Sequence, residues 1–239
     1  MNNSKWEAIE PDIKTILNLF DDPIHALSQA KIPAFIIRNA YNPNDCKELI
    51  ERFEHFGFLK DLKNLETDKR PRIDIGTSLG NLGGNSDRFF KHAKSTHLLF
   101  RFLFEGFQNP VHCIYQYLSE LCPEKTVATA REDDGSKYGP AIIRIHYDGQ
   151  RYKPHIDHVV LRENRLNYSV YKFKHQFAGI LCLQNADESG PGAQSRLHEC
   201  LWKPDIQPYI TSETFEDYAK KNRINFCQVE LEPGDLYFF

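Results

Sequence analysis

The sequence lacks several features that would assign a class of protein at once. It has no run of about 18 apolar residues and no apolar signal core at its N-terminus, so neither a membrane span nor a secretion signal is expected. The net charge is only −3, from 30 basic and 33 acidic residues. No basic excess therefore favours nucleic acid or an anionic membrane as a partner, and we expect a cytoplasmic protein.

Paired cysteines are also missing. The six cysteines are scattered, and none belongs to a Cys-x-x-Cys pair. This spacing favours reduced, mostly buried thiols over a disulfide framework or a zinc site. The sequence shows no internal repeat and no low-complexity tract, and its 239 residues with 41% hydrophobic side chains suit one globular domain.

A phosphate-binding loop is not supported either. Residues 76–87 are rich in glycine, but they lack the Gly-Lys-Ser/Thr ending of a P-loop and do not fit Gly-x-Gly-x-x-Gly. We expect a loop here, with Ser86 or Asp87 capping the helix that follows. The preceding residues 60–72 are highly charged and are predicted to be exposed.

The N-terminal half is predicted to be mainly helical, because apolar residues recur at helical spacing. We expect helices within residues 11–30, 42–53, 88–105 and 111–121. Pro23 should break the first into two pieces, and residues 32–38 form a short strand. The third helix has an aromatic face typical of a core helix, and its basic residues are interpreted as a solvated face. These basic residues are Lys91, His92, Lys94 and His97.

From residue 139 the pattern changes to strands. Strands are predicted at 141–147, 152–161, 177–184, 195–202, 226–231 and 236–239. The first two are expected to pair as a hairpin around Asp148 and Gly149. A short helix at 211–221, capped by Thr211 or Ser212, interrupts the strands.

The segment that carries candidate chemistry runs from Arg151 to His158. It holds His155 and Asp157 at positions i and i+2, which point to the same face in an extended strand and could reach one ion. An imidazole and a carboxylate, completed by a second imidazole, form the three-ligand face that leaves positions open on ferrous iron. The alternative is a surface strand end with solvated polar residues, because such a triplet also arises by chance.

Five pieces in the right order resemble the Fe(II)- and 2-oxoglutarate-dependent oxygenases, particularly their prolyl-hydroxylase-like branch. These pieces are residues 32–53, 144–157, 178–184, 190–197 and 233–239. The helical insert at 86–122 is similar to that of free-standing oxygenases and halogenases of small natural products. The resemblance implies an α+β fold with a double-stranded β-helix core, of jelly-roll or cupin-like type, and flanking N-terminal and inserted helices.

The resemblance also implies one oxygenase-like domain over the whole chain, residues 1–239. A helical extension (1–31) and a strand with a helix (32–58) precede an insert of loops and helices (59–138). The β-helix core follows (139–239). The glycine-rich loop and the aromatic helix of the insert are the candidate substrate lid.

The cofactors follow from the same resemblance. Iron(II) would be held by His155 and Asp157, with 2-oxoglutarate as cosubstrate and dioxygen as oxidant. Arg144, Tyr147 and Tyr152 flank the ligand segment and are candidates for binding a carboxylate of the cosubstrate. Cross-strand packing or a surface ion pair explains each of these three side chains equally well.

The third metal ligand is not evident within the sequence. In the family, a second histidine and then a basic anchor for 2-oxoglutarate follow the Pro-Gly-Asp strand. Here the chain ends at Phe239, so we expect both groups beyond that residue and interpret the last core strands as truncated. His198 is a further candidate for the third ligand, whereas His158 is expected near the pocket and His146 in the core.

Asp157 decides between the expected reactions. A carboxylate at this position fills the place that a halide needs, and the family's halogenases have a small residue instead. We therefore expect hydroxylation of an unactivated C–H bond of a small molecule. Two alternatives stay open, namely a peptidyl (prolyl-type) hydroxylase and a catalytically inactive β-helix that serves binding or scaffolding.

Overall fold

The computed structural model describes residues 6–59, 72–147, 150, 152–158, 165–185 and 194–239. The helices are α1 (Ile13–Leu19), α2 (Pro23–Ser28), α3 (Pro43–His55), α4 (Leu79–Leu82), α5 (Ser86–Leu103), α6 (Pro110–Leu121), the 3-10 helix η2 (Ser169–Lys172), α8 (Gln207–Thr211) and α9 (Phe215–Lys221). The strands are β1 (Phe35–Ile37), β2 (Ile73–Gly76), β3 (Ile142–Ile145), β4 (Gly179–Leu181), β5 (Gln194–His198), β6 (Phe226–Glu230) and β7 (Leu236–Phe238).

These strands form three small antiparallel sheets, ordered β1-β7-β4, β2-β3 and β5-β6. All residues of β1 and β7 are buried, which explains their continuous apolar sequence. Phe238 of β7 lies opposite Phe35 of β1 and Gly179 of β4. A Cβ at Gly179 would lie 2.7 Å from the Phe238 ring, so the glycine makes room for this ring at the centre of the sheet.

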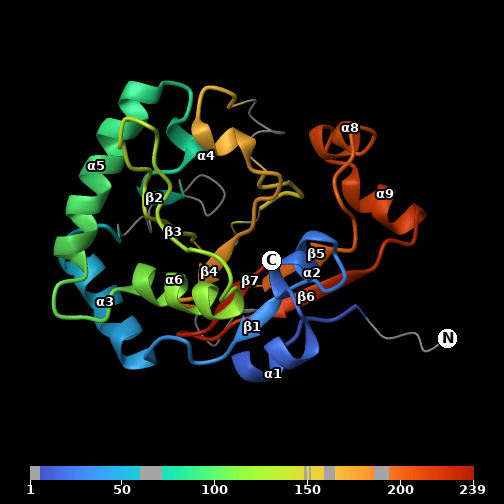
Figure 1. The fold of residues 1–239 in the computed structure, drawn as a ribbon, viewed down its shortest axis with the longest axis horizontal. Coiled ribbons are helices and arrows are strands. Elements are labelled where there is room, and N and C mark those ends of the chain that lie inside the picture. The colour runs from blue at the N-terminus through green and yellow to red at the C-terminus, as the bar shows by residue number, and fades with distance from the viewer. Residues whose placement is uncertain (1–5, 60–71, 148–149, 151, 159–164, 186–193) are drawn as a thin grey trace.

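The main hydrophobic core lies between this sheet and helices α1, α3, α5 and α6. Helix α3 shows how the sequence produces it: Cys46, Leu49 and Phe53 recur at helical spacing, and all three are buried. In Figure 1, α3, α5 and α6 lie on one side of the molecule, whereas α8 and α9 lie at the opposite end. The C-terminus lies between these two groups.

A buried carboxylate, Asp235, holds the turn before β7. Its side chain accepts hydrogen bonds from the backbone N–H groups of Asn39 and Glu232, each at 2.9 Å, and from Arg38 Nη1 at 2.7 Å. Burial alone would raise the pKa of Asp235, but these hydrogen bonds and the Arg38 charge outweigh burial and hold it below its ordinary value. Arg38 also pairs with Glu10, so one cluster joins the N-terminal segment, β1 and β7.

The predicted helices are confirmed, with corrections at their ends. The break at Pro23 separates α1 from α2, and Asn42 caps α3 by accepting from Asn44 N. Helix α5 is capped by Asn85, whose side chain accepts from Arg88 N at 2.9 Å, so the prediction of Ser86 or Asp87 as the cap was wrong. The predicted helix at 211–221 is two helices, α8 and α9, with Thr214 at the N-cap of the second. The prediction of Thr211 or Ser212 as its cap was therefore also wrong.

The observed strands and their pairing differ from the prediction more than the helices do. Strand β2 and helix α4 lie where only a loop was expected, and β3 pairs with β2. Residues 152–158 form no strand, so the predicted hairpin partner of β3 was wrong over this described part. Asp148, Gly149 and residues 159–161 lie outside the described residues.

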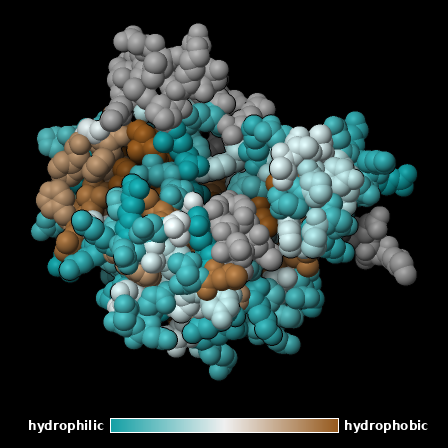
Figure 2. All heavy atoms as spheres, turned by 90° about the horizontal axis from the view of Figure 1, so that it is seen from above, coloured by the Kyte–Doolittle hydropathy of each residue, from teal (hydrophilic) through white to brown (hydrophobic). Residues whose placement is uncertain are grey.

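The aromatic face of α5 is only partly a core face. Phe89 and Leu103 are buried, but Leu98 is 58% exposed and Phe102 is 56% exposed. Figure 2 shows apolar side chains gathered on the side of the molecule where α5 lies, amid a mostly hydrophilic face. Part of this helix therefore packs against the core, while another part contributes apolar surface.

The observed architecture is a mixed α/β structure with small antiparallel sheets. It agrees with an α+β fold, and the double-stranded β-helix stays a prediction. All six cysteines are free, and five of them are buried, as the spacing predicted. Within the described ranges, no helix is long and apolar enough to cross a membrane.

We predict that Asp235→Asn lowers the free energy of unfolding by about 2–4 kcal/mol, because the amide cannot accept from all three donors. The pKa of Asp235 is lower when folded. The contribution of Asp235 to the free energy of unfolding is therefore complete above the ordinary aspartate pKa. It is lost as the pH falls through the pKa of Asp235 in the folded protein. Urea unfolding at neutral and acid pH should show the difference between variant and wild type shrinking in acid. Asp21→Asn, at an exposed position, is the matched control and should change stability by less than about 0.5 kcal/mol.

Candidate functional site

His155 and Asp157 face each other in an irregular segment between β3 and η2. His155 Nε2 lies 3.6 Å from Asp157 Oδ1, and each side chain is a little over one third exposed. The two side chains converge, as the sequence predicted. The cause is not alternation along a strand, because residues 152–158 are not in one.

The hydrogen bonding of His155 shows what its second nitrogen can do. Nδ1 lies 2.7 Å from the backbone oxygen of Lys153. Because a carbonyl only accepts, Nδ1 carries the proton, and in the neutral ring Nε2 is left with a lone pair facing the carboxylate of Asp157. In that form, the two acceptors could share one cation. An imidazole oriented by a carbonyl, next to a carboxylate, is a donor set that fits ferrous iron.

Tyr152 connects His155 to the β2–β3 sheet. Its ring centroid lies 5.2 Å from that of His155 and 4.9 Å from that of His146. Arg72 Nη1 donates to the Tyr152 hydroxyl, and the guanidinium carbon lies 5.3 Å from the centre of the ring. Arg72 is exposed, as the charged run predicted, and its guanidinium also packs on Tyr152, whose ring contacts His155.

Asp74 on β2 organises the cations near this segment. Its Oδ2 accepts from Arg72 Nη2 at 2.5 Å and from Asn81 Nδ2 at 2.6 Å. Arg144, directly opposite on β3, has its Nε 3.9 Å from Asp74 Oδ1. The cross-strand ion pair that was the alternative reading of Arg144 is therefore present.

These cations act on His146, which follows β3. Burial lowers the pKa of His146 below its ordinary value, and the positive charges of Arg72 and Arg144 lower it further, against a smaller opposing effect of Asp74. His146 is therefore held in its neutral form by its surroundings. Sequence reasoning placed His146 in the core. This was wrong, because the residue is exposed and its ring packs against that of Tyr152 beside the candidate site.

The other predicted residues lie at the margins of this site. Tyr147 forms a turn with Gln150: its N–H donates to Gln150 Oε1 at 2.9 Å, and its carbonyl accepts from Gln150 N at 3.0 Å. His158 Nε2 lies 3.4 Å from the backbone oxygen of Lys174. Arg144 and Tyr152 thus belong to the network around Asp74 and His155, and Tyr147 lies at its edge.

His198 is turned toward helix α9. Its ring packs edge-on against Phe215 at 5.0 Å, and its Nε2 lies 3.8 Å from Glu216 Oε1. In the part of the chain that the structure describes, no group of three or more His, Cys, Asp or Glu side chains could hold a metal. The structure therefore does not bring His198 together with His155 and Asp157.

Tyr237 links the candidate site to the central sheet. It is buried in β7, and its hydroxyl donates to Ser195 Oγ at 2.9 Å. Burial raises the pKa of Tyr237 to about 12, and the negative charge of Asp157 contributes to the rise. Sequence reasoning missed Tyr237, Arg72 and Asp74; the alternation of charged and apolar residues at 72–75 was the available signal for the last two.

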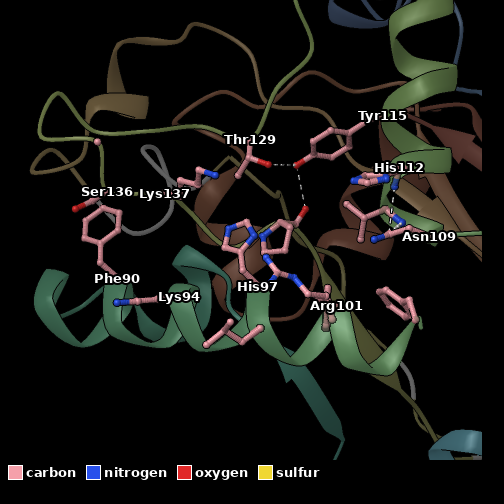
Figure 3. Close-up of a pocket in the computed structure, with 16 residues that line it drawn as sticks. Phe90, Lys94, His97, Arg101, Asn109, His112, Tyr115, Thr129, Ser136 and Lys137 are labelled. Carbon is pink, nitrogen blue, oxygen red and sulfur yellow. Dashed lines mark hydrogen bonds between the residues drawn. The ribbon is translucent and has the colours of Figure 1, made fainter. Parts of the chain in front are cut away.

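A cavity of about 850 Å³ lies elsewhere, between α5, the start of α6 and residues 129–140 (Figure 3). Neither His155 nor Asp157 lines it. The candidate metal ligands and this cavity are therefore separate features of the molecule.

The convergence of one histidine and one aspartate beside the central sheet indicates the class of the Fe(II)- and 2-oxoglutarate-dependent oxygenases. A family model, described as the carrier-protein-independent halogenase WelO5, matches residues 6–239. The chain belongs to this family, which lies within that oxygenase superfamily. Enzymes of this type depend on Fe(II), 2-oxoglutarate and dioxygen, and they act on a free small molecule. No curated protein matches the chain.

We predict that Arg72→Gln raises the pKa of His146, because the variant removes one nearby positive charge. The rise should be partial, since burial, the largest cause of the lowered pKa, persists. NMR titration of the histidine ring protons between about pH 5 and 8 measures it. Lys153→Gln removes a cation that pairs with Glu213 instead, and it should leave His146 unchanged. An unchanged pKa of His146 in Arg72→Gln would show that the charge of Arg72 does not contribute to the shift.

Proposed function

We propose that this protein is an Fe(II)- and 2-oxoglutarate-dependent oxygenase that hydroxylates an unactivated C–H bond of a free small molecule. One observation carries the proposal: His155 Nε2 and Asp157 Oδ1 face each other at 3.6 Å, and Nδ1 is engaged by a carbonyl. The family match supports the cofactors and the kind of substrate. The whole chain, residues 1–239, forms one oxygenase domain in this proposal, with the insert 59–138 as the substrate lid.

His155 and Asp157 hold the iron, which with 2-oxoglutarate and dioxygen supplies the oxidising chemistry when bound. The carbonyl of Lys153 keeps the proton on Nδ1, so that Nε2 is available as a ligand. Tyr152 covers one side of the imidazole and limits the access of water to it. The family pattern implies a histidine as the third ligand and a basic anchor for 2-oxoglutarate, and the described residues bring neither to this pair.

The cosubstrate's carboxylate has three candidate partners near this pair. Tyr152 and Arg144 belong to the cluster around Arg72 and Asp74. A bound carboxylate would take the place of Asp74 as the partner of the two arginines. Tyr147, at the turn after β3, is the third. Arg72 joins this set, since the guanidinium on the Tyr152 ring lies beside the ligand segment.

Asp157 separates hydroxylation from halogenation in this proposal. The family is named for a halogenase, and halogenases have a small residue where this chain has a carboxylate. With Asp157 as a ligand, the position that a halide needs is filled. Halogenation is the second candidate because the family match favours it. The aspartate at position 157 argues against it.

We predict that His155→Ala and Asp157→Ala each weaken Fe(II) binding by more than about 100-fold, because each removes a direct ligand. Anaerobic calorimetry with Fe(II) measures the affinity. His175→Ala, which changes an exposed histidine outside the pair, is the matched control and should bind iron as the wild type does. A wild type that takes up no iron would reject the enzyme and favour the scaffold alternative.

We predict that the wild type adds one oxygen atom to its substrate even when chloride is present, and that Asp157→Gly diverts part of the product to a chlorinated form. The smaller residue opens the position that the carboxylate fills. Succinate release over a panel of metabolites finds the substrate, and mass spectrometry of the products measures the outcome. Chlorination by the wild type would refute hydroxylation and establish the second candidate.

A further inference from the structure

Three segments enclose the cavity of about 850 Å³: α5, the first turn of α6 and residues 129–140. Cavities of this size accommodate whole small molecules in proteins. Figure 3 shows His97 and Arg101 extending from α5 toward the opposite wall, where Thr129 and Tyr115 lie. The side chains therefore line a hollow that is partly open to solvent, with Lys94, Arg101 and Lys137 exposed.

The charge of the lining is of one sign. Lys94, His97 and Arg101 lie at i, i+3 and i+7 on α5 and share one face of the helix, and His112 and Lys137 add to them from the other two segments. The chain has 33 acidic residues, yet none of them lines the cavity. Within the described ranges, no carboxylate lies within ion-pair distance of Lys94, Arg101 or Lys137, so these cations are available to an anion.

Helix α6 adds to this positive potential. It begins at Pro110, and Asn109, Val111 and His112 at its N-terminus line the cavity. The Asn109 side chain already accepts from the Val111 and His112 N–H groups, at 2.9 and 3.4 Å. The helix therefore contributes through the positive end of its dipole, and the side-chain cations provide the direct contacts.

The rest of the lining is apolar and held in place. The rings of Phe100 and Phe104 are buried 5.1 Å apart, and Phe90 lies toward the other end of α5. The Tyr115 hydroxyl donates to the Pro140 carbonyl at 3.1 Å, which ties α6 to the opposite segment. His97 is tied in the same way, with Nε2 2.8 Å from the Tyr138 carbonyl.

We propose that this cavity is a binding site for a small organic anion, a carboxylate or phosphate ester attached to an aromatic or apolar body. The unpaired cations hold the charged group, and the accessible apolar lining residues Phe90 and Leu98 contact the body. Lys94 is exposed, as the interpretation of a solvated face predicted, and His97 is half-buried; in this proposal both side chains also line the site. The site is separate from His155 and Asp157, and the proposal does not depend on the proposed function.

The test uses three probes of the same shape: 2-naphthoate, 2-naphthyl phosphate and the neutral 2-naphthamide. We expect at least one anion to bind saturably at low salt and the amide to bind at least about tenfold more weakly, because the charge-assisted contacts are lost. The better anion identifies the charged group. Arg101→Gln should weaken its binding about tenfold. Lys91→Gln, which also removes one positive charge from α5 but lies outside the lining, should not.

Binding of the anion should persist in His155→Ala. The test of this site is therefore independent of the proposed metal ligands, and its result stands even if the oxygenase hypothesis is wrong. Several results would overturn the proposal: no saturable binding of either anion, equal binding of the amide, equal effects of Arg101→Gln and Lys91→Gln, or loss of binding in His155→Ala. Sedimentation of Arg101→Gln and Lys91→Gln tests whether a second copy of the chain, rather than a small anion, binds this surface. Self-association that only Arg101→Gln abolishes would assign the surface to a second copy of the chain.

Discussion

The buried carboxylate of Asp235 fixes the position of the strand on which the candidate site depends. Its three donors come from Asn39, Arg38 and Glu232, so it joins the end of β1 to the turn that starts β7. A carboxylate buried in this way is stable only while all its donors stay in place. Tyr237 follows two residues later, bonds to Ser195 and senses the charge of Asp157. The geometry beside the candidate metal ligands is thus anchored from the opposite end of the central sheet.

Two acceptors facing each other define the site more sharply than the sequence motif does. In a chance pairing on the surface, the imidazole would be expected to turn its N–H toward the carboxylate. Here Nδ1 of His155 faces the carbonyl of Lys153, so in the neutral ring Nε2 is the unprotonated nitrogen, and it faces Asp157. The neighbouring cations Arg72 and Arg144 add positive charge that suits an anionic cosubstrate. The family match and the local chemistry therefore point to the same cofactors from independent directions.

Sequence periodicity predicted the helices well, because α3 and α6 carry regular apolar stripes with Asn caps and Pro at their first turns. It missed β2, a four-residue strand after a charged run, because its partner β3 is about 70 residues away and short strands carry little local signal. His155 and Asp157 were identified, but through a strand that residues 152–158 do not form. The exposure of Arg72 was predicted, but its partners Tyr152 and Asp74 were not, because they come together only through tertiary packing.

The buried cysteines of the core are relevant to how such an enzyme resists oxidation. Burial raises the pKa of Cys46, Cys113 and Cys182 to about 11 in each case. At neutral pH only about one such group in ten thousand is a thiolate, the form that peroxides and other oxidants attack. These three core thiols are therefore poorly reactive toward oxidants, and exposure to air should leave them unmodified.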